Sequence, residues 1–250
     1  MVRMRCGCGC ANNSCRLRRR IKLVGSGGIS TPRSPLDAAG FTEPELRAGV
    51  EAAEDWATYA TVHAYTPVTI QRAIAAGARC VEYGHLMDEA TAKLMSEKGT
   101  WLSIQPFVGD DDSICLTGES RVQQLQVLAA TDTAYTLARK YGIKTAFGSD
   151  LLFSGTLTIR QGTMLTHLTR WYGASEILQM ATAANAELLR LSGPRKPYSG
   201  KLGVVEEGAL ADLLLVDGNP IDDVKLVADP AKNFLIIMKD GKIHKDALSP

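Results

Sequence analysis

Short apolar runs alternate with amphipathic stretches along the chain, and this pattern predicts strands that alternate with helices. The predicted strands lie at residues 21–24, 60 to about 63, 79–85, 101–107 and 144–150. The predicted helices lie at about 43–56, 68–76, 88–95, 121–140, 163–171 and 174–191. Such an order predicts a parallel sheet with right-handed crossovers, and its regular repetition suggests a (β/α) barrel. A complete barrel has eight such units, and this chain supplies five.

The predicted domain organisation is α/β, with a partial (β/α) barrel over residues 21–198 and a small C-terminal β appendage over 199–250. The appendage is predicted from short strands around turns, including a hairpin with Asp240-Gly241 at its turn. Residues 1–20 follow neither period, and they carry a run of closely spaced cysteines followed by arginines: Cys6, Cys8, Cys10 and Cys15. We interpret them as a disordered basic arm. A metal clip and a site of intermolecular disulfides are the alternatives.

Composition narrows the class of protein further. The chain has 250 residues with 45% hydrophobic and 22% charged residues, as is ordinary for a globular protein. A net charge of +1 argues against a general nucleic-acid binder, because phosphate neutralisation needs a basic surplus. No apolar run approaches the ~20 residues that span a bilayer, and the first twenty residues lack the apolar core of a signal peptide. We therefore expect no membrane partner and a cytoplasmic location.

Side chains that carry chemistry stand at the ends of the predicted strands. His63 ends a strand that feeds a helix beginning near Pro67, Asp150 ends another, and Glu82 and His85 stand at the end of a third. In parallel α/β proteins ligands and catalytic groups collect at these ends. A lone histidine is more often a core or capping residue. The prediction of a functional site therefore depends on finding such side chains at the ends of three strands rather than on His63 alone. Lys22 lies within the first strand, where it either has a chemical role or reaches out to solvent.

Together these residues resemble the metal-dependent amidohydrolase superfamily, in its branch of imidazolonepropionase-like enzymes and prolidase-like dipeptidases. The resemblance spans about Ile21 to Lys245 and is most specific at five segments: Ile21–Gly28, Val62–Pro67, Phe147–Asp150, Ala181–Ala186 and Gly208–Leu213. It implies a (β/α)8 barrel, of which this chain would hold about strands four to eight, with one or two divalent metal ions, usually Zn²⁺, at the strand ends. It also implies that the metal ligands include Lys22, His63 and Asp150, and that Asn185 is structural.

Two departures from the family pattern change what we expect of the metal site. The strand-one His-x-His is absent, so the chain looks like the carboxyl-terminal part of a longer enzyme. The strand-six motif Glu-His-Gly is replaced by Glu82-Tyr83-Gly84, with Tyr83 at the ligand position. His85 could substitute, since a shift of two residues keeps the same face of a strand, or it could be a supporting residue. We therefore expect one metal ion rather than two, held by Lys22, His63, Asp150 and His85.

The resemblance implies a hydrolase that cleaves amide or ester bonds of small molecules with a metal-activated water. Asp150, Lys22 and His63 are the predicted catalytic residues, and Tyr65 and His85 are predicted to bind substrate. For Tyr65 the alternative is a packed aromatic residue. The competing hypothesis is a non-catalytic remnant without metal. Under both hypotheses we expect a homo-oligomer, because five strands cannot close a barrel. A serine hydrolase is a poor third option, because the Gly-x-Ser-x-Gly elbow is missing, and the sequence does not identify the substrate.

Overall fold

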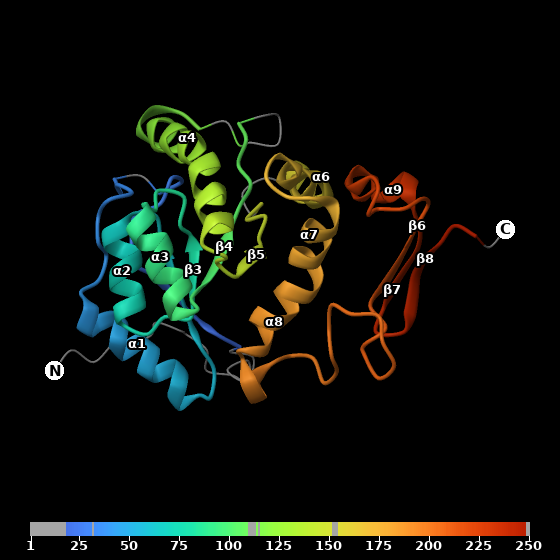
Figure 1. Ribbon diagram of the computed structural model, residues 1–250, viewed down its shortest axis with the longest axis horizontal. Coiled ribbons are helices and arrows are strands. Elements are labelled where there is room, and N and C mark those ends of the chain that lie inside the picture. Colours follow the sequence, from blue (N-terminus) through green and yellow to red (C-terminus); the bar gives the residue numbers. More distant parts are fainter. Residues whose placement is uncertain (1–18, 32, 110–113, 115, 152–154, 249–250) are drawn as a thin grey trace.

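The computed structural model describes residues 19–31, 33–109, 114, 116–151 and 155–248 (Figure 1). The predicted arm at residues 1–20, with its cysteines, therefore lies almost wholly outside the described residues, and Cys115 does too. Within those ranges five strands form a parallel sheet in consecutive order: β1 (Ile21–Val24), β2 (Ala60–Ala64), β3 (Cys80–Tyr83), β4 (Trp101–Ile104) and β5 (Thr145–Phe147). The α/β prediction and the parallel order are confirmed.

Four helices connect these strands, and their ends follow local sequence signals: α1 (Glu43–Asp55), α2 (Pro67–Ala75), α3 (Glu89–Lys98) and α4 (Gly118–Lys140). Thr42 and Glu45 form the predicted capping box, in which the Glu45 carboxylate accepts a hydrogen bond of 2.9 Å from the Thr42 amide. The side chain of Asp88 caps α3, which ends at Gly99 with a left-handed φ of 62°. The helices therefore begin and end close to where the sequence places them.

Three strands are shorter than predicted because the chain turns early. β3 ends at Tyr83, whose φ is 79°, and Gly84 continues the turn with a φ of 67°. The predicted strand at residues 79–85 is therefore wrong in its last two residues, and His85 does not continue the face of the strand on which the argument for its substitution depended. β4 ends before Pro106 and β5 ends at Phe147, so Asp150 follows its strand after two intervening residues.

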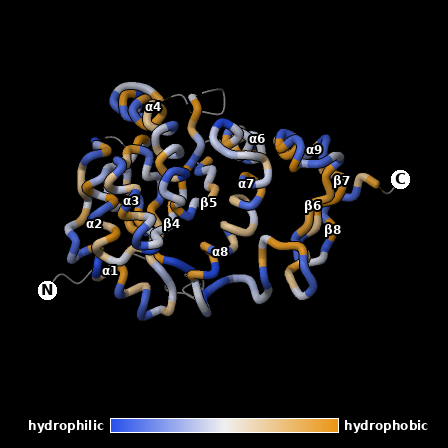
Figure 2. Tube along the Cα trace, viewed as in Figure 1, coloured by the Kyte–Doolittle hydropathy of each residue, from blue (hydrophilic) through white to orange (hydrophobic). Residues whose placement is uncertain are grey.

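The two faces of the parallel sheet differ in character. On one face Val62, Val81 and Leu102 are fully buried in a core that they share with residues of α1 to α4. The strand register places Lys22 beside Thr61, His63 beside Glu82 and Glu82 beside Ser103 on the other face. That face therefore carries polar side chains toward the carboxyl ends of the strands. Figure 2 shows hydrophobic and hydrophilic residues interspersed along the trace of both the helices and the strands.

The lower part of the polar face is covered by apolar residues and a helix. Tyr59, Cys80, Trp101 and Ala146 form a small cluster with Leu188 of α8 (Asn185–Arg190). The helix predicted for residues 174–191 is present as one unbroken helical run, in which α7 (Ala174–Gln179) passes through a π-helical turn, η3 (Met180–Ala184), into α8. Three short helices precede it: α5 (Gly155–Thr158), α6 (Gln161–Thr166) and η2 (His167–Arg170). These residues and helices cover the lower part of the polar face only, so the carboxyl ends of the strands remain open to the cavity described below.

The last fifty residues form the small β appendage that the sequence predicts. Its antiparallel sheet has the order β6 (Leu213–Val216), β7 (Phe234–Lys239) and β8 (Lys242–Asp246), and the hairpin turns at Asp240 and Gly241 with positive φ at both. Two short helices complete this region, η5 (Val224–Ala228) and α9 (Pro230–Asn233), and a third, η4 (Gly193–Arg195), lies between α8 and the appendage. Figure 1 shows the appendage beyond α7 and α8. None of the helices in the described ranges is long and apolar enough to cross a bilayer.

Candidate active site

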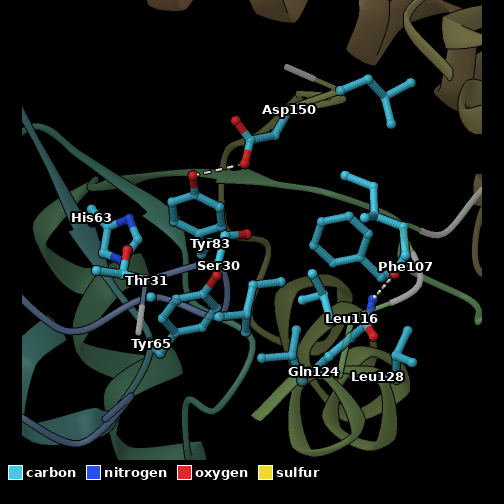
Figure 3. A pocket seen from close by; sticks show the side chains of 15 residues that line it. Ser30, Thr31, His63, Tyr65, Tyr83, Phe107, Leu116, Gln124, Leu128 and Asp150 are labelled. Atoms are coloured by element: carbon cyan, nitrogen blue, oxygen red, sulfur yellow. Dashed lines mark hydrogen bonds between the residues drawn. The ribbon is translucent and has the colours of Figure 1, made fainter. Parts of the chain in front are cut away.

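A cavity of about 140 Å³ opens at the carboxyl ends of the parallel strands (Figure 3). Its polar side is lined by side chains from four separate segments: Thr31, His63, Tyr65, Tyr83 and Asp150. These segments are the loop after β1 and the ends of β2, β3 and β5. The convergence that the sequence predicts for the strand ends is therefore present for His63, Tyr65 and Asp150.

His63 is held by the glycine-rich loop that follows β1. Its Nε2 lies 2.8 Å from the carbonyl oxygen of Gly27, and because a carbonyl only accepts, Nε2 carries the proton and Nδ1 the lone pair. Gly28 packs over the ring, since a Cβ there would lie 3.4 Å from His63 Cε1. Burial lowers the pKa of His63, the hydrogen bond to Gly27 raises it, and the charge of Lys22 lowers it again. The imidazole is thus neutral near pH 7.

Asp150 and Tyr83 form a hydrogen-bonded pair across the cavity. The Tyr83 hydroxyl donates to Asp150 Oδ2 at 2.8 Å. Both residues have a positive φ, 79° at Tyr83 and 52° at Asp150. Residues other than glycine seldom adopt this region of backbone conformation. Burial raises the pKa of Tyr83, and the charge of Asp150 raises it further. The phenol therefore stays protonated and acts as a donor.

The ring of Tyr83 also contacts three of the other predicted residues, His63, Tyr65 and Lys22. The Tyr83 ring meets the His63 ring edge-on at 4.4 Å between centroids and stacks on Tyr65 at 5.0 Å. The Lys22 ammonium lies 5.4 Å from the centre of the Tyr83 ring. Lys22 is exposed on the edge strand β1, in line with the alternative that its side chain reaches out to solvent. Tyr83, noted in the sequence only as a replaced ligand, lies at the centre of the group.

His85 lies apart from this cavity. Its imidazole is fully buried, with Nε2 at 3.0 Å from the carbonyl oxygen of Gln105, and it stacks on Phe107 at 5.4 Å between centroids. Burial lowers the pKa of His85 to about 4, although the hydrogen bond to Gln105 acts in the opposite direction. The ring supports the end of β4 and the wall residue Phe107, and it is not among the residues that line the cavity.

The far side of the cavity is apolar. Its residues come from the segment after β4, from α4 and the loop just before it, and from the segment after β5: Phe107, Leu116, Val127, Leu128 and Leu151. Gln124 of α4 also lines it, and its amide donates to the carbonyl oxygen of Ile114 at 2.7 Å. The sequence analysis did not single out this wall, because single apolar residues in a loop and on a helix give no pattern of their own. The cavity therefore pairs a polar end with an apolar end.

The donor set was tested against the expected zinc ion. Zinc sites in proteins use three or four imidazole, thiolate or carboxylate ligands. Within the described ranges no three side chains of His, Cys, Asp or Glu lie close enough to hold one ion. His63 and Asp150 supply two such groups, and the third candidate is Lys22. The described residues thus fall short of a complete zinc site.

Comparisons with known proteins place this geometry in context. The sequence pattern described as the amidohydrolase family matches residues 10–244. Ochratoxinase of Aspergillus niger is 29% identical over 235 residues, which are 90% of this chain and 46% of that protein. A prolidase solved with N-methylphosphonate-L-proline has a TM-score of 0.81 at 33% identity and covers 91% of this chain and 55% of its own. An Xaa-Pro dipeptidase solved with methionine in its active site has a TM-score of 0.78 at 29% identity, with 91% and 54% covered. The chain spans about half the length of the relatives it matches.

Proposed function

The chain belongs to the amidohydrolase family, and from this premise we propose that it is a hydrolase that cleaves amide bonds in small molecules. The resemblance seen in the sequence, including the prolidase-like branch, is confirmed by the same matches. The observation that carries the proposal is the meeting of His63 and Asp150 in a cavity at the strand ends. The apolar wall of that cavity favours substrates with an apolar group beside the scissile bond. Ester bonds suit the same chemistry.

In the proposed reaction water adds to the substrate carbonyl while Asp150 takes its proton, and Asp150 then gives a proton to the leaving amine. The products are a carboxylic acid and an amine, so atoms and protons balance. Tyr83 holds Oδ2 of Asp150, which leaves Oδ1 as the oxygen that we assign to proton transfer. Tyr65 is proposed to donate a hydrogen bond to the substrate, because burial raises the pKa of Tyr65 and keeps its phenol protonated.

Family members are generally metal-dependent, and the resemblance implies one Zn²⁺ ion with Lys22, His63 and Asp150 among its donors. The described residues do not complete that site, so the proposal made here does not include a bound ion. His85 is left out of this set, because its Nε2 faces the carbonyl oxygen of Gln105 within the protein interior. Since the described residues fall short of a complete zinc site, no step above passes through the ion. The same shortfall favours the second candidate function, a non-catalytic partial barrel without metal.

We also propose that the parallel sheet is part of a (β/α) barrel and that the chain self-associates. The supporting observations are the consecutive strand order and the position of β1 at an edge of the sheet. Edge strands offer unpaired backbone groups to another chain. This part of the proposal is independent of catalysis and has its own test at the scale of the whole molecule.

The hydrolase proposal is tested on purified protein with dipeptides and N-acyl amino acids that carry apolar acyl groups. We expect amine release, and a loss of about 100-fold or more in kcat/KM in His63→Ala and in Asp150→Ala. The exposed residues His244 and Asp217 provide matched controls, His244→Ala and Asp217→Ala, which should keep full activity. Zinc that copurifies with the wild type and is lost from the His63→Ala, Asp150→Ala double variant would restore the metal site that the resemblance implies and contradict a site without a bound ion. A folded wild type that hydrolyses none of these substrates favours the non-catalytic alternative.

A further inference from the structure

Tyr83 contacts four of the five residues that the sequence assigns to the site, and the ring of the fifth, His85, lies 6.5 Å away between centroids. Its hydroxyl binds Asp150, its ring packs edge-on against His63 and stacks on Tyr65, and the Lys22 ammonium lies over its face. No other residue is recorded with contacts to all four within the described ranges. Figure 3 shows the ring between His63 on one side and Asp150 on the other. The side chain thus occupies the centre of the group rather than its edge.

The backbone is arranged to hold Tyr83 in this position. A φ of 79° at a bulky residue is strained, and it persists where the surrounding contacts hold it. Asp150, its hydrogen-bond partner, carries the same kind of strain with a φ of 52°. Gly84 follows with a φ of 67° and donates its amide to the carbonyl oxygen of Ala64 at 2.9 Å. Two strained residues that bind each other across a cavity indicate a site rather than accidental packing.

The phenol orients a carboxylate here without supplying charge. It donates one hydrogen bond to Asp150 Oδ2 and remains neutral, whereas a divalent cation would bind Asp150 and His63 together. The ring packs against His63 and the hydroxyl binds Asp150, so Tyr83 contacts both of the side chains that such an ion would need.

We propose that Tyr83 is a positioning residue that fixes the Asp150 carboxylate beside His63, and that its ring fills the space in which these two side chains would share a divalent cation. The first half rests on the proposed hydrolase function. The second half concerns cation binding alone and does not depend on activity. Asp150 and His63 are held in place by an aromatic donor where a metal ion would otherwise hold them.

The cation half is tested with Mn²⁺ on the chelator-treated full chain, because Mn²⁺ prefers carboxylate and imidazole and discriminates against the cysteine-rich residues 1–20. Free Mn²⁺ is counted from its electron paramagnetic resonance signal. Tyr83→His adds an imidazole at this position, and histidine is one of the residue types that tolerate a positive φ. We expect this variant to bind Mn²⁺ about tenfold more tightly than the wild type. Tyr83→Ala opens the same space and should also bind more tightly. Tyr65→His, which adds an imidazole to the same stack without touching Asp150, is the matched control and should change affinity by less than about threefold.

Folding of each variant is checked by circular dichroism before titration. If Tyr83→His and Tyr83→Ala are folded and neither binds Mn²⁺ more tightly than the wild type, the ring does not occupy the shared space and the proposal is overturned. If Tyr83→His does not fold, the comparison of Tyr83→Ala with the wild type decides the question. An equal gain in Tyr65→His would also count against a specific role for Tyr83.

The positioning half is tested with Tyr83→Phe, which keeps the ring and removes the hydrogen bond. We expect kcat to fall about tenfold while KM stays within about twofold, because substrate contacts remain and only the carboxylate loses its support. A purely structural role would instead lower the melting temperature and change both constants. An unchanged kcat overturns the positioning role. If the wild type itself is inactive, the hydrolase proposal fails while the Mn²⁺ comparison still decides the cation half.

Discussion

The imidazole of His85 lies fully enclosed between the ends of β3 and β4, with 1% of its surface exposed. Its Nε2 donates to the carbonyl oxygen of Gln105 at 3.0 Å, and Nδ1 has no hydrogen-bond partner within the described part of the chain. Its neighbours are the Gln105 carbonyl oxygen and the rings of Phe107, Tyr65 and Tyr83, so among the described residues no carboxylate contacts the ring to balance a positive charge. The protein interior therefore favours the neutral ring strongly.

This residue makes the stability of the protein depend on pH on the acid side. The pKa of His85 is about 4 in the folded chain and near 6.5 when unfolded, so the unfolded chain binds more protons between these values. The contribution of His85 to the free energy of unfolding is fully present above pH ~6.5 and is lost as the pH drops toward 4. The free energy of unfolding therefore falls by about 2 kcal/mol between pH 7 and pH 5. Urea unfolding at both pH values measures this loss. His85→Phe should flatten the slope by that amount while the exposed His244→Gln should not, and equal slopes in all three proteins would contradict the prediction.

At the residue scale the sequence predicted four of the side chains that lie together, but it also placed His85 among them, which the structure buries apart from the cavity, and it did not predict what lies between them. Lys22, His63, Tyr65 and Asp150 were chosen because they stand in or just after predicted strands, and the structure brings them to one group. The central place of Tyr83 depends on a left-handed φ, which no hydrophobic pattern encodes for a residue other than glycine. Their catalytic and metal-binding roles stay predictions.

Asn185 shows how an irregular element supports the end of the sheet. It follows the π-helical turn η3, and its side-chain amide accepts from the Phe147 amide at 3.0 Å and donates to the Phe147 carbonyl oxygen at 3.1 Å. One amide group thus satisfies both backbone groups of Phe147 on the side of β5 that faces away from β4. A π-turn shifts a side chain relative to a regular helix, and such turns are frequent at functional sites.

Removal of this amide should weaken the end of β5. In Asn185→Ala the donor and acceptor of Phe147 lose their partners, and we expect the free energy of unfolding to fall by about 1–3 kcal/mol. Thr182→Ala is the matched control, since Thr182 is exposed on the same turn and bonds only within its helix, to Leu178. It should change stability by less than about 0.5 kcal/mol. Denaturant unfolding of both variants decides the matter, and equal stabilities would show that Asn185 does not support β5.

The elements themselves were largely predictable, and the exceptions have physical reasons. Alternating apolar runs and capping residues fixed the order of strands and helices, as at Thr42 with Glu45 and at Asp88 with Gly99. Strand ends were placed too late where the chain turns through positive φ or meets a proline, at Tyr83 and before Pro106. The π-turn was not predicted, because one extra residue within a helix leaves the apolar period almost unchanged.

For the molecule as a whole, the two edges of the parallel sheet are unequal. The outer edge of β5 is met by Asn185, whereas β1 pairs with β2 on one side and has no strand on the other within the described residues. Lys22 and Val24 are exposed on β1, and Val24 keeps 57% of its surface accessible. An edge of this kind invites another chain to pair with it. The homo-oligomer predicted from the incomplete barrel therefore has a defined place to form.

We expect sedimentation analysis of the purified chain to give a mass of at least two chains, with dissociation on dilution. Val24→Lys places a second charge on β1 beside Lys22, so it should shift the equilibrium toward single chains by about tenfold or more, because like charges on an edge oppose strand pairing. Val122→Lys on α4 is the matched control, since Val122 is exposed to the same 57% and lies away from the sheet edge. A wild type that sediments as one chain at every concentration contradicts self-association, and an equal shift in both variants places the contact elsewhere than β1.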